Sequence, residues 1–198
     1  MGAFGKRPLV VGIGGSDGPG SATERALART LEEAERRGAD VRLFGGVFLG
    51  ELPLFRPRRP DRTWHATELV EAVSRADGVI VATPSYHGCV SGVVKNALDY
   101  LEDLRRHDRP YLDGRAVGCV VTSAGTQAGG ITLAALRAIV HALRGWPTPF
   151  GATLDVVPGA PITDKDAGKL AIVAGQVVEF ARMAGATHDA GDAVEAAR

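Results

Sequence analysis

Short apolar runs alternate with longer amphipathic segments along most of the chain. The apolar runs have the length and composition of strands that are covered on both faces of a sheet. The clear runs are Leu9–Ile13, Val41–Phe44, Gly78–Ala82 and Ala116–Thr122, and a weaker run at Thr148–Val156 predicts a fifth strand.

The segments between these runs repeat apolar residues at the spacing of a helical face. They predict helices at Ser21–Arg37, Thr63–Ala76, Val93–Arg106 and Gly130–Leu143, and a last helix that begins near Thr163 or Asp164. Strict alternation of strands and helices is typical of a three-layer α/β fold, in which helices cover both faces of a parallel sheet. We predict a five-stranded parallel sheet in a single domain, residues 1–185, and a C-terminal tail, residues 186–198, that is disordered.

Composition and charge narrow the class of protein. Lys plus Arg and Asp plus Glu each number 23, so the net charge is zero and gives no electrostatic case for a nucleic-acid or membrane partner. Cys89 and Cys119 form no metal-binding pattern, so we expect neither a disulfide framework nor a metal site. No apolar run approaches the ~18 residues of a membrane span, and the N-terminus leads directly into a strand pattern. We therefore expect a cytoplasmic protein.

The loops that follow the strands are the candidate site, because ligands of open parallel sheets bind at the carboxyl ends of the strands. The first such loop, GGSDGPGSAT at Gly14–Thr23, lacks the Lys of a triphosphate-binding loop. It also lacks the third Gly of a dinucleotide fingerprint, since Asp17 stands there. Its hydroxyls and the helix N-terminus behind it suit one phosphate monoester. An equally good interpretation is that Ser21 caps the helix and Glu24 completes a capping box.

Two more loops of small and polar residues follow the third and fourth predicted strands. ATPSYHGCVSGVVK, at Ala82–Lys95, places Tyr86 between Pro84 and Gly88, where an aromatic ring beside backbone N–H groups can hold a flat ligand. A surface turn is the simpler alternative. TSAGTQAGG, at 122–130, lets the backbone approach a ligand closely, or makes a tight connection from strand to helix. Three such loops at one edge of a sheet favour a flat ligand that carries a phosphate.

Together the three loops resemble the NAD(P)H-dependent FMN reductase family, flavodoxin-like proteins that include azo-dye and quinone reductases. The first loop is similar to the family pattern G-S-x-R-x-x-S-x-N. TPSYHGCVSGVVKNALDYL at 83–101 is similar to P-E-Y-N-x-S-x-P-G-x-L-K-N-A-L-D, and SAGTQAGG at 123–130 to S-x-G-x-x-G-G. Gly18 stands in place of the family Arg, for which Arg25 is the candidate substitute, and Ser85 and His87 stand in place of Glu and Asn.

The resemblance implies a site for FMN built from all three loops. The implied cofactor-binding residues are Ser16, Gly18, Gly20, Ser21, Ala22 and Thr23 at the phosphate, Pro84, Ser85, Tyr86, His87 and Gly88 along the isoalloxazine ring, and Ser123, Ala124 and Gly125 on the opposite wall. No side chain is predicted to be catalytic, because the cofactor carries the chemistry. His87 is a candidate modulator, although its backbone amide alone can account for its place in the motif.

The implied reaction is hydride transfer from NADPH or NADH to flavin N5, followed by reduction of free flavin, a quinone or a similar small acceptor. Two alternatives stay open: a flavoenzyme of a biosynthetic pathway that acts on one dedicated metabolite, and a flavodoxin-type electron carrier, which the neutral charge disfavours. The resemblance also implies a homodimer or homotetramer, to which the helix with Lys95 and Asp99 contributes. The run Arg56, Arg58, Arg59 and Arg62 either attracts the 2′-phosphate of NADPH or forms a solvated loop.

Overall fold

A twisted sheet forms the middle layer of the protein in a computed structural model that describes residues 7–16, 18, 20–157 and 159–195. Its parallel strands are β1 (Leu9–Gly14), β2 (Asp40–Phe44), β3 (Gly78–Tyr86), β5 (Ala116–Ser123), β6 (Trp146–Pro147) and β7 (Ala152–Asp155). The order is β2-β1-β3-β5, with both β6 and β7 paired to the outer side of β5. A short strand, β4 (Cys89–Val90), runs antiparallel to the end of β3.

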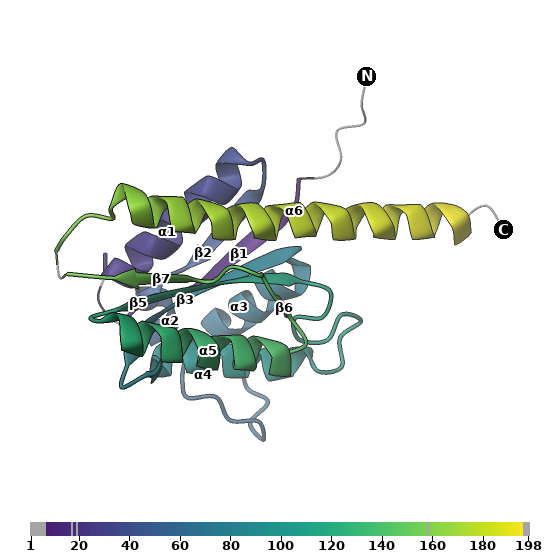
Figure 1. Cartoon of the computed structure of the whole chain (residues 1–198). Helices are drawn as coiled ribbons and strands as arrows, with labels where there is room; N and C mark the ends of the chain where they lie inside the picture. Colours follow the sequence, from purple (N-terminus) through teal and green to yellow (C-terminus); the bar gives the residue numbers. More distant parts are fainter. Residues whose placement is uncertain (1–6, 17, 19, 158, 196–198) are drawn as a thin grey trace.

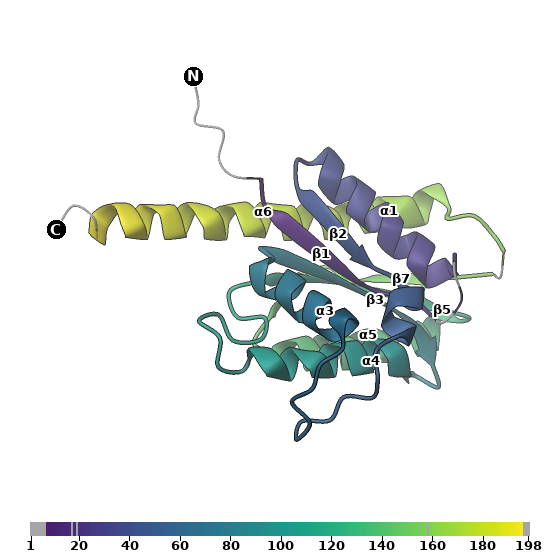
Figure 2. The same ribbon diagram turned by 180° about the vertical axis from the view of Figure 1, so that it is seen from behind.

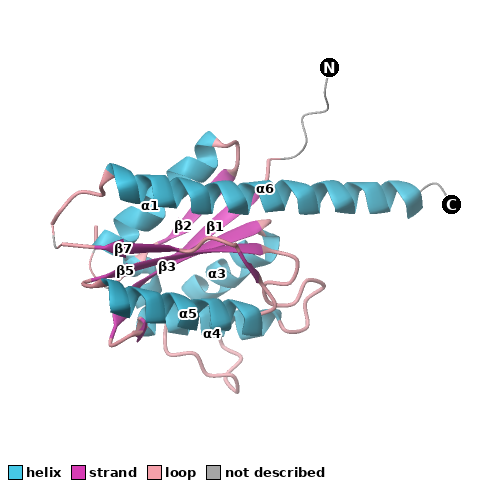
Figure 3. Ribbon diagram, in the orientation of Figure 1, coloured by secondary structure: helices cyan, strands magenta, loops and turns pink. Residues whose placement is uncertain are grey.

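Helices cover both faces of this sheet, as Figures 1 and 2 show from opposite sides and Figure 3 shows by element type. One face carries α1 (Ala22–Arg36) and α6 (Asp164–Glu195). The other face carries α3 (Trp64–Arg75), α4 (Gly92–Asp99) with its 3-10 continuation η1 (Tyr100–Leu104), and α5 (Thr126–Ala142). A short helix, α2 (Gly46–Gly50), follows β2. The predicted parallel α/β architecture is therefore confirmed.

Alternation along the strands divides the core into two halves. Val11 and Val79 point to the layer of α3, α4 and α5, whereas Val10 and Ile80 point to the layer of α1 and α6, and all four are fully buried. Because successive side chains of a strand point to opposite faces, strands that are apolar at every position are covered on both sides. The almost continuous apolar runs of the sequence encode this arrangement.

At the edge of the sheet beside β5, we predicted one strand at Thr148–Val156. The structure has two shorter strands there: β6 pairs with β5 at Ala116 and Val117, and β7 pairs with β5 from Val120 onward. Pro147 and Pro149 have no N–H to donate to a ladder, so the edge is interrupted between the two pieces. The prediction of one continuous strand there was wrong, although its place at this edge was right.

Several helix boundaries in the structure also differ from the predicted ones. α5 begins at Thr126 rather than Gly130, and the helix predicted to end at Arg106 changes to a 3-10 helix at Tyr100. The backbone of α6 continues to Glu195, beyond the domain boundary that we predicted at residue 185, and this end of the helix extends away from the sheet (Figure 1). The division into a domain and a disordered tail stays a prediction. Among the described residues, no helix is both long and apolar enough to cross a membrane.

Candidate functional site

The carboxyl ends of β1, β3 and β5 lie side by side, at the left of the sheet in Figure 1. β1 pairs with β3 up to Gly14 and Ala82, and β3 pairs with β5 up to Pro84 and Thr122. The chain passes from β1 to β2 on one side of β1 and then crosses to β3 on the other side, so the winding direction reverses between β1 and β3. The three predicted loops therefore meet at one edge, at the place where this fold binds ligands.

Ser21 caps the N-terminus of α1. Its Oγ accepts the N–H of Glu24 over 3.2 Å, which confirms the capping interpretation for this side chain. The Glu24 carboxylate, however, accepts the N–H of Gly20 over 3.1 Å, so the second bond of the predicted capping box has moved by one residue.

Thr23 is buried in the first turn of α1. Its hydroxyl lies 2.5 Å from the hydroxyl of Thr122, which belongs to β5. This contact joins the first turn of α1 to the carboxyl end of β5. The Thr23 side chain is therefore engaged, and its backbone N–H in the first helical turn is the group that can meet a phosphate.

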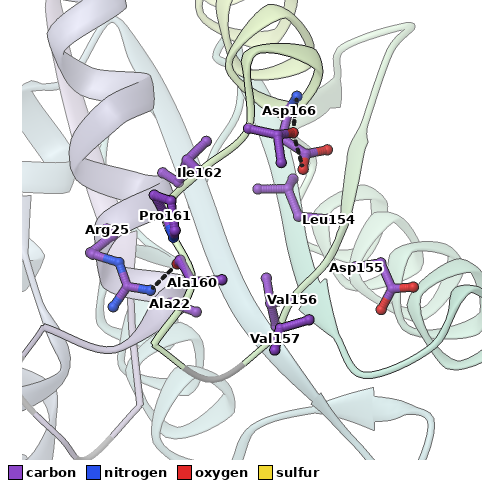
Figure 4. A pocket seen from close by; sticks show the side chains of 11 residues that line it. Ala22, Arg25, Leu154, Asp155, Val156, Val157, Ala160, Pro161, Ile162 and Asp166 are labelled. Atoms are coloured by element: carbon purple, nitrogen blue, oxygen red, sulfur yellow. Dashed lines mark hydrogen bonds between the residues drawn. The ribbon is translucent and has the colours of Figure 1, made fainter.

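Ser16, Gly18, Gly20 and Ala22 complete the described part of the first loop, while Asp17 lies outside the described residues. A side chain at Gly18 or Gly20 would meet no atom within 4 Å, so the backbone there borders open space. Arg25 donates to the Gly20 carbonyl over 2.6 Å and, as Figure 4 shows, to the Ala160 carbonyl over 3.1 Å. Arg25 thus braces the loop against the segment that precedes α6.

A small pocket lies beside Arg25, between the start of α1 and the connection from β7 to α6 (Figure 4). Its volume is about 100 Å³, and its lining includes Ala22, Leu154 and Ile162. Pockets that enclose a drug-sized ligand have roughly 300–1,000 Å³. A tricyclic ring is too large for this pocket.

The second loop is the turn of a β-hairpin between β3 and β4. Tyr86 pairs with Cys89, and the two residues between them, His87 and Gly88, have φ values of 54° and 76°. Positive φ at both central positions is typical of a type I′ turn, in which the first residue needs a tolerant side chain and the second is usually Gly. His87 and Tyr86 are both exposed at the tip.

Ser85 fastens this hairpin to α5. Its Oγ lies 2.7 Å from the Thr132 hydroxyl and donates to the Ala128 carbonyl over 3.2 Å. Pro84, directly before it, is buried at the end of the sheet. The side chain that stands in place of the family Glu therefore has a structural role of its own, because it fixes the backbone that the resemblance places along the flavin ring.

The third loop leads from β5 into α5. The Ser123 hydroxyl donates to the Gly125 carbonyl, and the Gly125 N–H donates to the Asp155 carboxylate, both over 2.9 Å. Gly125 has φ 115°, which only Gly adopts readily, and α5 has no side-chain cap. Ala124 is exposed beside it. The loop thus presents a second helix N-terminus to the candidate site.

These features fit FMN. The first N–H groups of α1 and α5 have no acceptor within their own helices, and such groups bind phosphate and other anions well. Backbone at Gly18, Gly20 and Gly125 is open to a ligand, since an added Cβ would meet nothing within 4 Å there. Tyr86 and Ile131 add exposed apolar surface next to the hairpin, where a flat ring can pack.

Other candidate residues lie outside this edge. Arg62 pairs with Asp103 over 2.6 Å and lies over the ring of Phe55, while Arg56 and Arg59 line an open pocket of about 310 Å³ next to it. Lys95 and Asp99 form an ion pair within α4, also over 2.6 Å.

The buried Cys119 contributes no reactive thiolate to the described edge. Burial raises the pKa of the Cys119 thiol to about 12, although Arg137 lowers it slightly, so this thiol stays protonated. Cys89 is exposed beside the hairpin turn. Among the described residues, no group of His, Cys, Asp and Glu side chains could hold a metal ion.

Sequence reasoning missed two side chains of the site, Thr132 and Asp155, and one contact, that of Glu24 with Gly20. Asp155 ends β7, so the rule that places ligands at strand ends would have pointed to it if that strand had been predicted with its correct boundary. Thr132 faces a hairpin that the sequence pattern does not indicate, and no local signal identifies it.

Comparisons with known proteins agree with this geometry. A model of the family described as NADPH-dependent FMN reductase matches residues 8–156. An NADPH azoreductase of Bacillus sp. (strain OY1-2) is 29% identical over 120 residues, which are 60% of this chain and 62% of that protein. An FMN-dependent NADPH-azoreductase of Staphylococcus aureus is 38% identical over 82 residues, 41% of this chain and 40% of that protein. The matched part thus spans less than two thirds of these relatives.

A solved structure supports the fold. The flavoenzyme NAD(P)H:(acceptor) oxidoreductase of Paracoccus denitrificans superposes with a TM-score of 0.71 at 19% identity, over 89% of this chain and 98% of that one. The strand order also matches the flavodoxin-like order. The predicted fold and the predicted FMN cofactor are confirmed, and the chain belongs to the NADPH-dependent FMN reductase family.

Proposed function

We propose that the protein is an FMN-dependent oxidoreductase that uses NADPH or NADH to reduce small acceptors such as azo compounds, quinones or free flavin. The observation that carries the proposal is the convergence of three small, polar loops at the ends of β1, β3 and β5, with two helix N-termini open to a ligand. Family membership supports the same reaction class. Two relatives named as azoreductases support an azo compound as one kind of acceptor.

In this proposal, the first loop binds the FMN phosphate. The N–H groups of Ala22 and Thr23 lie in the first turn of α1, where the helix dipole favours an anion. Ser16 adds a half-buried hydroxyl on the side of the loop toward β1. Ser21 contributes mainly as the cap that holds this turn in place.

The second and third loops hold the ring. FMN, when bound, supplies the redox chemistry, since it accepts a hydride from the nicotinamide and passes electrons to the acceptor. The protein orients the ring between the hairpin Pro84–Gly88 and the segment Ser123–Gly125. Backbone N–H groups along the hairpin can donate to the ring edge that becomes negative on reduction. No proton transfer by a side chain is needed in this proposal. At the exposed tip, the backbone of His87 has the main role, and its imidazole stays a candidate modulator.

We also propose that the protein works in the cytoplasm as a homodimer or homotetramer. The neutral charge and the absence of a membrane-spanning helix among the described residues are compatible with this location. The resemblance supports assembly through α4, and light scattering during gel filtration measures the oligomeric state directly.

The test of the function is turnover with small molecules alone. Purified protein, FMN and NADPH are mixed with an azo dye or a quinone, and NADPH oxidation is followed with and without protein. We expect protein-dependent oxidation that requires FMN and reduces the acceptor. Turnover that needs a protein partner would instead indicate a carrier of the flavodoxin type. Negligible turnover with every generic acceptor, despite flavin reduction, would indicate an enzyme dedicated to one metabolite.

A further inference from the structure

The carboxylate of Glu24 lies inside the loop that the proposed function gives to the FMN phosphate. Its Oε2 accepts the N–H of Gly20 over 3.1 Å. Backbone N–H groups of such a loop are what a phosphate uses for binding. In this structure, one of them is already used by an anion that belongs to the protein.

Gly45, at the end of β2, makes room for this carboxylate. A Cβ at Gly45 would lie 2.4 Å from Glu24 Oε1, which is shorter than any van der Waals contact allows. Gly45 has φ −83°, a value that any residue adopts, so its backbone gives no reason for Gly. The space that Gly45 leaves open is the space that the carboxylate fills.

The cation beside the loop does not neutralise this carboxylate. The guanidinium of Arg25 donates its hydrogen bonds to the carbonyls of Gly20 and Ala160. Gly18 stands where the resembling family has an Arg. The described part of the loop therefore combines a carboxylate that occupies one N–H group with a guanidinium that is engaged elsewhere.

We propose that Glu24 acts as an internal competitor of the FMN phosphate and thereby makes the protein hold FMN weakly enough to exchange it. A phosphate monoester carries about −1.5 to −2 charges near neutral pH, so the Glu24 carboxylate repels it and must leave the Gly20 N–H for it to bind. The inference rests on the proposed function. It makes Glu24 a residue that sets the preference of the loop between phosphorylated and unphosphorylated flavin.

The test is a pair of binding titrations on the cofactor-free protein, with quenching of flavin fluorescence as the readout. FMN carries the phosphate and riboflavin lacks it, so riboflavin reports the ring site alone. We expect Glu24→Gln to tighten FMN binding by about tenfold and to leave riboflavin binding within about twofold. Glu35→Gln, an exposed residue on the same helix, removes the same charge far from the loop and should change neither affinity.

A second variant moves the carboxylate without changing the charge of the protein. Gly45→Ala places a methyl group where Glu24 Oε1 lies, so the carboxylate has to shift from its present position. We expect Gly45→Ala also to tighten FMN binding, and to have no further effect in the Glu24→Gln background. Additive effects of the two changes would show that Gly45 acts independently of Glu24, and would overturn the proposed competition.

The outcomes separate this inference from the proposed function. If Glu24→Gln weakens FMN binding or leaves it unchanged while riboflavin still binds, Glu24 merely shapes the loop and the inference is wrong, but the flavin site stands. If neither flavin binds to the wild-type protein or to any variant, the proposed function fails and the inference fails with it. Thermal melting of each variant shows that the fold is kept, and riboflavin binding confirms this at the site itself.

Discussion

The hydroxyl of Thr23 lies 2.5 Å from the hydroxyl of Thr122, and both residues are buried. Thr23 lies in the first turn of α1 and Thr122 is the second-last residue of β5, so this hydrogen bond connects the first loop of the site to the third. Buried hydroxyls need a partner, and each of these supplies the other. The relative placement of the two loops depends in part on this pair.

Thr122→Val is therefore expected to leave the Thr23 hydroxyl buried without its partner. We expect a loss of about 1–2 kcal/mol in the free energy of unfolding, measured by urea denaturation. The double change Thr23→Val and Thr122→Val removes both polar groups, so it should cost less than the sum of the two single changes. The exposed Thr67→Val on α3 serves as the control. Strict additivity would show that the two hydroxyls do not depend on each other.

Ser85→Ala releases the hairpin from α5, because it removes the bonds to Thr132 and the Ala128 carbonyl. We expect FMN and riboflavin binding to weaken equally, by roughly fivefold, since the hairpin holds the ring and not the phosphate. Titration with both flavins measures this effect. Ser74→Ala removes a hydroxyl whose only described bond is local, and should leave both affinities unchanged. A loss confined to FMN would place Ser85 at the phosphate and contradict this assignment.

Substitutions at His87 test whether the imidazole itself has a role or only the backbone conformation of the turn matters. Asn tolerates the positive φ of this position, whereas β-branched Val does not. We expect His87→Asn to keep the turnover rate within about twofold, and His87→Val to cost about 1–2 kcal/mol of stability and to weaken flavin binding. A rate that falls strongly in His87→Asn, with flavin binding intact, would give the imidazole a direct role in the reaction.

The lowered pKa of Asp166 predicts that the free energy of unfolding decreases at acidic pH. Burial raises the pKa of this carboxyl, but hydrogen bonds from Lys169 and Thr163 and the charge of Lys169 outweigh it, so the pKa lies below its ordinary value. The native state thus binds the proton less readily than the unfolded chain does. The stabilisation is present above the ordinary pKa of an aspartate and is lost as the pH falls below it.

Asp166→Asn is accordingly expected to cost about 1 kcal/mol at neutral pH and almost nothing in strong acid. Denaturation curves over a series of acidic pH values measure this difference. Asp164→Asn, at an exposed position in the same helical turn, is the matched control. An equal cost at every pH would mean that the carboxylate charge of Asp166 contributes nothing.

The sequence predicted the layers of the fold and the edge that carries the site, because both follow from periodicity. Runs such as Gly78–Ala82 are apolar at each position, and only a strand between two helix layers buries all of these side chains. The hairpin at His87 was missed because its second strand, β4, is too short to show alternation.

Tertiary contacts account for the remaining differences. Arg115 is fully buried and donates to the carbonyls of Ser74, Ala76, Tyr111 and Asp113. Burial, helped by Arg109, lowers the pKa of its guanidinium to about 10, so it remains a cation at neutral pH. No local pattern distinguishes this Arg from those of the solvated loops. The same holds for Glu24, whose carboxylate is placed by the space at Gly45, a residue far away in the sequence.

The central claim is tested most directly by the visible spectrum of FMN mixed with the protein under anaerobic conditions, before and after addition of NADPH. The account predicts that the flavin absorbance bleaches at a catalytically useful rate only when the protein is present. It also predicts that subsequent addition of a quinone restores the absorbance. A flavin that binds to the protein but stays oxidised with both NADPH and NADH would contradict the claim that this site transfers hydride from a nicotinamide to FMN.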